Sequence, residues 1–124
     1  MRGLHLTADL RGCDASQPLM HELDALRTVC INSVKAADLG AVGELFHRFM
    51  PAPDQVQGGI TGVVLLAESH LAVHTWPELG AVTLDVYVCN LGQDNSKKAE
   101  HLLDAMCQAF RPGTADRQQL IRGR

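Results

Sequence analysis

A short run near the middle of the chain carries an unusual density of reactive side chains. Between Glu68 and Glu78 the sequence holds a serine, two histidines, a threonine and a tryptophan, and Cys89 follows soon after. A hydroxyl or a thiol can act as a nucleophile or proton donor when a base lies nearby, and imidazole is the side chain best suited to be that base near neutral pH. These residue types favour nucleophilic or acid–base chemistry centred on Ser69, His74 and Cys89.

Two segments with strand-like alternation carry these residues. Residues 70–76 and 82–88 both alternate with period two, and a turn-forming Pro-Glu-Leu-Gly run lies between them, so they predict a β-hairpin. One face of this hairpin is apolar, and the other carries the aromatic, imidazole and thiol groups. The hairpin brings Cys89 close to Ser69, and we expect the serine, the imidazole of His74 and the thiol to gather near one end of the sheet.

The rest of the chain alternates between strand-like and helix-like periodicities. Further strands are expected at residues 4–10, 42–49 and 60–67, with a short final one near 118–121. Apolar residues every three or four positions predict a helix from residue 19 to about residue 40, with Pro18 in its first turn, and a second from Asn95 or Ser96 to Phe110. These elements predict an α+β two-layer sandwich, an antiparallel sheet with two helices packed on one face and the other face near a dimer interface.

Length, charge and cysteine spacing limit the function classes. The 124 residues suit one domain spanning 1–124, and the net charge of −3 argues against a nucleic-acid-binding surface. The longest apolar stretch, 63–67, is far too short to cross a bilayer, and the first residues do not resemble a secretory signal. The four cysteines lack Cys-x-x-Cys spacing, so we expect free thiols in a cytoplasmic protein without nucleic-acid or membrane partners.

The run LAESHLAVHTWPE at residues 66–78 resembles the self-cleaving segment of the prokaryotic pyruvoyl-dependent S-adenosylmethionine decarboxylase proenzymes. Further matching segments are FHRF at 46–49, GITGVV at 59–64, DVYVC at 85–89, His5, and GCD at 12–14. Two features depart from the family pattern. The loop at 51–57 is longer than the usual connection, and Thr61 stands where serine is common.

The resemblance implies self-cleavage between Glu68 and Ser69. In that chemistry Ser69 Oγ attacks the Glu68 carbonyl carbon, and the resulting ester undergoes β-elimination, which breaks the chain and leaves dehydroalanine. Hydrolysis then releases ammonia and leaves a pyruvoyl group on the α chain, residues 69–124, while residues 1–68 become the β chain. By the same resemblance, His74 accepts the serine α-proton and the Thr61 hydroxyl assists ester formation.

The resemblance also implies the reaction of the processed enzyme. The covalent pyruvate cofactor, derived from Ser69, forms a Schiff base with S-adenosylmethionine and accepts electrons as CO2 leaves, and Cys89 donates the proton to Cα. Phe49 and Trp76 suit the adenine and sulfonium, and Glu78 suits the ribose hydroxyls. The product, S-adenosylmethioninamine, supplies the aminopropyl group for spermidine synthesis. The family implies a homodimer of processed protomers, with Phe49 reaching the site from a neighbouring subunit.

Three other functions were weighed. The same scaffold could decarboxylate ornithine or arginine, for whose distal cation Asp54 is one possible partner. A non-catalytic paralogue that dimerises with an active enzyme is disfavoured, because the serine, imidazole and thiol are all retained. A metal module using His70 and His74 with His5 or His47 is also disfavoured, since positions i and i+4 of a strand lie about 13 Å apart. No metal site is therefore expected.

Overall fold

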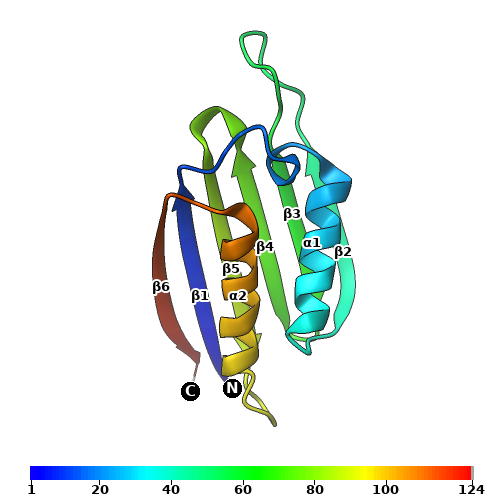
Figure 1. Cartoon of the computed structure of the whole chain (residues 1–124). Helices are drawn as coiled ribbons and strands as arrows, with labels where there is room; N and C mark the ends of the chain where they lie inside the picture. The colour runs from blue at the N-terminus through cyan, green and yellow to red at the C-terminus, as the bar shows by residue number, and fades with distance from the viewer. Residues whose placement is uncertain (124) are drawn as a thin grey trace.

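Six strands form one antiparallel sheet, and both helices cover the same face of it (Figure 1). The computed structural model describes residues 1–123. The elements in chain order are β1 (Arg2–Arg11), α1 (Leu23–Ala36), β2 (Ala41–Arg48), β3 (Ile60–Leu66), β4 (Ser69–Trp76), β5 (Ala81–Cys89), α2 (Ser96–Phe110) and β6 (Thr114–Gly123). The strand order is β2-β3-β4-β5-β1-β6, and the predicted α+β two-layer sandwich is confirmed.

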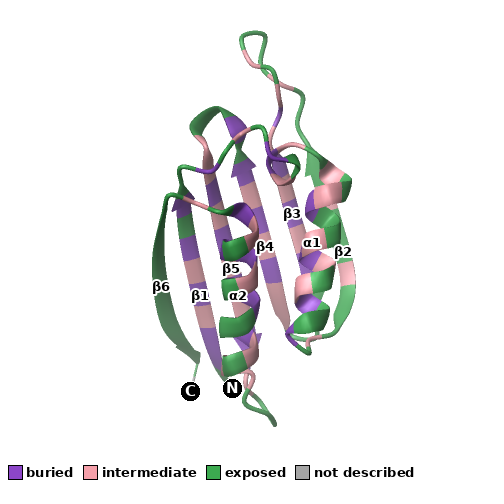
Figure 2. Ribbon diagram, viewed as in Figure 1, coloured by how far each residue is buried: buried purple, intermediate pink, exposed green. Residues whose placement is uncertain are grey.

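The core lies between the sheet and the helices, as alternation in the central strands predicts. Figure 2 shows buried and less buried residues alternating along β1, β4 and β5. The buried members from β1 and β5 are Leu4, Leu6, Ala8, Leu10, Val82, Leu84, Val86 and Val88. They face the helical stripes, formed by Leu26, Cys30 and Val34 of α1 and by Leu102, Leu103, Met106 and Phe110 of α2. Within residues 1–123, no helix covers the opposite, open face of the sheet.

The first predicted helix is wrong at its start. Pro18–Met20 forms a separate 3-10 turn, and α1 begins only at Leu23. Tertiary contacts account for the break, because the Met20 side chain is fully buried and its carbonyl accepts a 2.9 Å hydrogen bond from Thr75 Oγ1 of β4. A periodicity argument cannot detect this anchor, which lies 55 residues away in the sequence.

The last strand is longer than predicted. A short strand near residues 118–121 was expected, whereas β6 covers Thr114–Gly123 and pairs with β1 along its whole length. All its side chains are exposed, so no apolar alternation marks it in the sequence. Main-chain hydrogen bonds to β1 hold this edge strand. Among residues 1–123, neither helix is long and apolar enough to cross a membrane.

Candidate active site

The predicted cleavage site lies in the tight turn between β3 and β4. Ser69 begins β4 and pairs with Leu66, so Ala67 and Glu68 form a two-residue connection. Glu68 has φ of 57°, a left-handed conformation that is unfavourable for a residue with a Cβ atom. The bond that the resemblance marks for cleavage therefore follows a strained residue.

The thiol of the predicted proton donor lies beside this turn. Cys89 ends β5, and its backbone N–H donates a 3.0 Å hydrogen bond to Ser69 Oγ. Its side chain is buried, with 8% of the residue exposed. The hairpin register is also as predicted, with His70 opposite Tyr87 and the following pairs in step. We call the group formed by Glu68, Ser69 and Cys89 the Ser69 end of the sheet.

Two asparagines that the sequence analysis did not connect with the site hold Cys89 in place. The Asn95 carboxamide donates a 2.9 Å hydrogen bond to the Cys89 carbonyl, and Asn90 Oδ1 accepts a 2.8 Å bond from the Asn95 backbone N–H. Asn95 was expected only at the start of the second helix. It does occupy that position, but its side chain makes no capping bond. The detectable signal was the pair of asparagines that follows the predicted strand.

The predicted base lies near the opposite end of β4. His74 pairs with Thr61 across β3 and β4, and Thr61 Oγ1 lies 3.0 Å from His74 Nδ1. The indole ring of Trp76 lies 5.9 Å from the imidazole ring, centroid to centroid. The threonine hydroxyl is therefore within hydrogen-bond distance of the imidazole and can orient it. We call Thr61, His74 and Trp76 the His74 end.

The expectation that serine, imidazole and thiol gather at one end of the sheet is wrong. Ser69 and His74 are five residues apart in one continuous strand, which separates their Cα atoms by about 16 Å at 3.3 Å per residue. Hydrogen bonding in a general-base step requires about 3 Å. The chain thus brings Cys89 to Ser69 and Thr61 to His74, but it does not bring His74 to its own Ser69.

The predicted substrate-binding residues lie at the His74 end. A cavity of about 330 Å³ is lined by Phe49, Trp76 and Glu78 together with Thr61 and His74. Phe49 and Trp76 are partly exposed, with 51% and 37% of each residue accessible, so their apolar surface is available to a ligand. Phe49 is thus in the same half-site as the His74 of its own chain, and far from its own Ser69.

Aromatic and imidazole rings line the open face between the two ends. The His70 and Tyr87 ring centroids lie 5.8 Å apart, and His5 meets the edge of Tyr87 at 6.2 Å. His5 Nε2 is also 3.1 Å from an Asp85 carboxylate oxygen, and the Arg122 guanidinium lies 5.7 Å from the Tyr87 ring centroid. Within residues 1–123, no group of three or more His, Cys, Asp or Glu side chains is arranged to hold a metal ion.

The other three cysteines are core residues. Burial raises the pKa of the Cys30 thiol to about 12, and it raises the pKa values of Cys13 and Cys107. All four cysteines are free thiols, as expected. A thiol with a raised pKa is a poor nucleophile at neutral pH, which leaves these three with a packing role.

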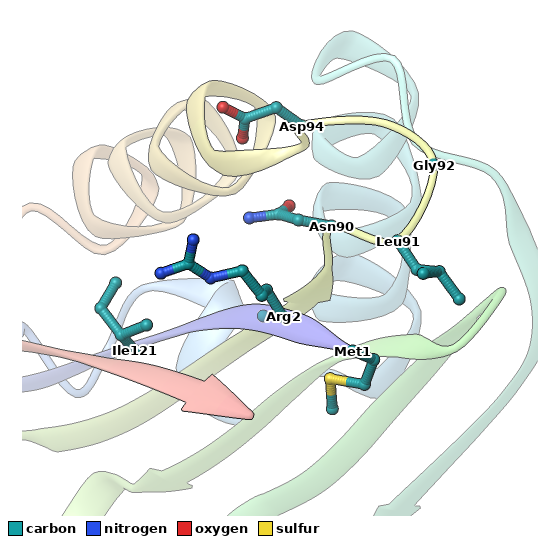
Figure 3. A pocket seen from close by; sticks show the side chains of 8 residues that line it. Met1, Arg2, Asn90, Leu91, Gly92, Asp94 and Ile121 are labelled. Atoms are coloured by element: carbon teal, nitrogen blue, oxygen red, sulfur yellow. The ribbon is translucent and has the colours of Figure 1, made fainter. Parts of the chain in front are cut away.

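A second hollow lies beyond the Ser69 end, on the loop that follows β5 (Figure 3). Figure 3 shows Arg2 extending from β1 beside Asn90 and Asp94 of this loop. Two of its polar groups already serve the loop itself, because Asn90 Nδ2 donates to Ser96 Oγ at 3.1 Å and Asp94 accepts from the Ser96 backbone N–H at 2.9 Å. None of the predicted site residues lines this hollow.

Comparisons with known proteins agree on one family. The family described as S-adenosylmethionine decarboxylase matches residues 4–123. An S-adenosylmethionine decarboxylase proenzyme from Aquifex aeolicus is 38% identical over 98% of this chain and 81% of its own length. The proenzyme from Picrophilus torridus is 34% identical over 98% and 84% of the two chains. A crystal structure of the Aquifex aeolicus adenosylmethionine decarboxylase superimposes with a TM-score of 0.84 and 36% identity, covering 98% of this chain and 91% of that one.

Proposed function

The chain belongs to the S-adenosylmethionine decarboxylase family, and we propose that it cleaves itself at Glu68-Ser69 and then decarboxylates S-adenosylmethionine. The observation that carries the proposal is the division of the predicted machinery into two intact halves. Ser69 Oγ is hydrogen-bonded to the Cys89 backbone N–H at one end of β4, and His74 is hydrogen-bonded to Thr61 near the other end. The predicted substrate residues accompany the second half.

Each active site is then assembled from two chains. When two open faces stack on each other, a two-fold axis that lies between them and perpendicular to the strands reverses the strand direction. It therefore places the Ser69 end of one chain against the His74 end of the other. The open face supports this packing because alternation places Leu45, Leu65 and Leu120 on it, with 72%, 48% and 57% of each residue exposed. Phe49 reaches Ser69 from the second chain together with His74, which matches the expectation drawn from the family.

Processing uses one residue from each half at every step. The Ser69 hydroxyl attacks the Glu68 carbonyl, and the Thr61 hydroxyl of the second chain assists this ester formation. The second chain's His74 then removes the serine α-proton, and the ester bond breaks by elimination. The fixed position of Ser69 Oγ, 3.0 Å from the Cys89 backbone nitrogen, and the strained turn at Glu68 support this role for the serine.

In the mature enzyme the pyruvate group derived from Ser69 supplies a ketone that binds the substrate amine and withdraws electrons from Cα. The chain's own residues bind the substrate and deliver the proton. Cys89 is buried beside this position and donates its thiol proton to Cα after CO2 leaves. Phe49 and Trp76 pack against the adenine and sulfonium, and Glu78 accepts hydrogen bonds from the ribose hydroxyls.

Four free thiols support a reducing compartment, so we place the enzyme in the cytoplasm.

Purified protein tests the proposal directly. We expect two fragments on a denaturing gel, release of CO2 from carboxyl-labelled S-adenosylmethionine, and sedimentation as a dimer of processed protomers. The carboxy-terminal fragment should resist Edman sequencing because a pyruvoyl group has no amine, and Ser69→Ala should remain one intact chain. Labelled ornithine and arginine serve as alternative substrates. An uncleaved wild-type chain, or CO2 release from ornithine or arginine alone, would contradict the proposal.

A further inference from the structure

A hairpin-like arm stands out from the body of the molecule between β2 and β3 (Figure 1). It contains residues 50–58, and its base is closed by a 2.9 Å hydrogen bond from the Phe49 backbone N–H to the Gly59 carbonyl. Two glycines permit this closure. A Cβ atom on Gly58 would lie 1.7 Å from the Phe49 carbonyl oxygen, and one on Gly59 would lie 2.1 Å from the Thr75 carbonyl oxygen. The base of the arm is therefore held tightly against β4.

This arm supplies one wall of the cavity at the His74 end. Met50, Ala52 and Gln55 line the cavity together with the predicted binding residues. Within the arm, the Gln55 backbone N–H donates a 2.9 Å hydrogen bond to the Ala52 carbonyl, which fixes the turn that carries the side chain. Among residues 1–123, no hydrogen bond engages the Gln55 carboxamide, although the side chain is only half-exposed.

The chemistry of this wall matches one part of the proposed substrate. Phe49 and Trp76 offer apolar ring surfaces to a flat base, but ring packing does not distinguish adenine from other purines. A glutamine carboxamide holds a donor and an acceptor side by side, and it can pair with the exocyclic amine and N7 of adenine, accepting from the amine and donating to N7. Such a pairing disfavours a 6-oxo purine, because O6 and N7 are then both acceptors, and in either orientation the carboxamide oxygen faces one of them.

We propose that Gln55 of the arm is a specificity residue that recognises the adenine amine of the substrate. The inference rests on the proposed function, since it assigns the cavity to the adenosine part of S-adenosylmethionine. It adds to that function a selective contact from a segment longer than the usual family connection.

The arm contains its own matched control. Gln57 is the same residue type with similar exposure, but it lines only another hollow, of about 290 Å³, beside Ala15 and Pro77, which Gln55 borders as well. Gln55→Ala and Gln57→Ala both remove a carboxamide from this hollow, but only Gln55→Ala removes one from the cavity at the His74 end. Both variants should still cleave themselves, because the groups assigned to processing, Ser69, Thr61 and His74, are unchanged in each.

The test compares S-adenosylmethionine with its 6-oxo analogue, S-inosylmethionine, by steady-state kinetics on processed enzyme. We expect Gln55→Ala to raise KM for the adenosyl substrate about tenfold, with kcat little changed, and to leave KM for the inosyl analogue within about twofold. Gln57→Ala should change neither KM by more than about twofold. Loss of the adenosyl preference in Gln55→Ala alone supports the inference.

Two outcomes would overturn it while leaving the proposed function intact. One is an unchanged KM for S-adenosylmethionine in Gln55→Ala, and the other is an equal loss for both substrates or in both variants, which would indicate a general effect of the arm. A wild-type enzyme that cleaves itself but does not decarboxylate S-adenosylmethionine would overturn the proposed function, and this inference with it.

Discussion

The two ends of β4 hold their reactive groups in different ways. At the Ser69 end the hydroxyl is tied to the backbone of Cys89, whose carbonyl is in turn held by Asn95, and the thiol is buried. At the His74 end one side chain orients another, and both line an accessible cavity. In the proposed function the first end forms the ester and donates a proton, and the second end removes a proton and binds the substrate. Neither is sufficient by itself.

Mixing two inactive chains offers the strongest test of this division. Ser69→Ala lacks the nucleophile and His74→Ala lacks the base, so neither should cleave alone. When both are co-expressed, a hybrid dimer pairs the intact Ser69 end of the His74→Ala chain with the intact His74 end of the Ser69→Ala chain. With random pairing, we expect about half of the His74→Ala chains to be cleaved.

Tags of different mass distinguish the chains on a denaturing gel. The Ser69→Ala chain should remain whole in the mixture, which provides the internal control. A mixture that stays fully uncleaved, although the two chains co-purify as a dimer, would show that His74 acts within its own chain.

The second prediction concerns Cys89 at the Ser69 end. Cys89→Ala should still cleave itself, because its backbone N–H still reaches Ser69 Oγ, but turnover should fall by about 10² to 10⁴, the usual effect of losing a positioned proton donor. Without that donor, protonation at the wrong carbon converts the pyruvoyl group to alanine. Mass spectrometry of the carboxy-terminal fragment should show alanine accumulating faster than in the wild type. If Cys89→Ala is fully processed and turns over at the wild-type rate, the thiol is not the proton donor and has only a packing role.

A smaller effect is expected from the strained turn at the Ser69 end. The left-handed conformation of Glu68 costs a residue with a Cβ atom about 1–2 kcal/mol, and cleavage releases that strain. Glu68→Gly removes the strain beforehand, so self-cleavage should slow, by about 5- to 30-fold if the whole strain is released in the transition state. Glu68→Gln keeps the Cβ atom and serves as the control. Time courses on freshly synthesised protein measure both rates, and equal rates would show that the strain has no part in processing.

The smallest effect is expected from Cys30, a thiol outside both ends. Its pKa in the folded chain is raised to about 12 from an ordinary value of 9.0. The stabilisation from this neutral thiol is complete below pH 9 and is lost as the pH rises towards the folded value, so the free energy of unfolding should fall by about 1 kcal/mol between pH 8 and pH 10. In urea unfolding, the free energy of unfolding of Cys30→Ala should fall by about 1 kcal/mol less than that of the wild type over the same pH range. If the free energies of unfolding of the wild type and Cys30→Ala fall in parallel with pH, the raised pKa of Cys30 is contradicted.

Most of the fold could be predicted from local sequence patterns. The alternation in β1, β4 and β5 identified the apolar face, and the helical stripes identified what covers it, because both periodicities follow from backbone geometry alone. Prediction failed where distant contacts decide the structure. The Met20 anchor shortened the first helix, and main-chain pairing with β1 extended the exposed strand β6.

The candidate site divides in the same way. The types of Ser69, His74 and Cys89, their strand positions and the hairpin register could all be derived from the sequence, because each depends on neighbours along one hairpin. Two features depended on the tertiary structure. It separated His74 from its own Ser69, since an unbroken strand holds the two about 16 Å apart. It also folded the arm so that Gln55 lines the same cavity as His74. This fold depends on close backbone approaches at Gly58 and Gly59, which no local periodicity encodes.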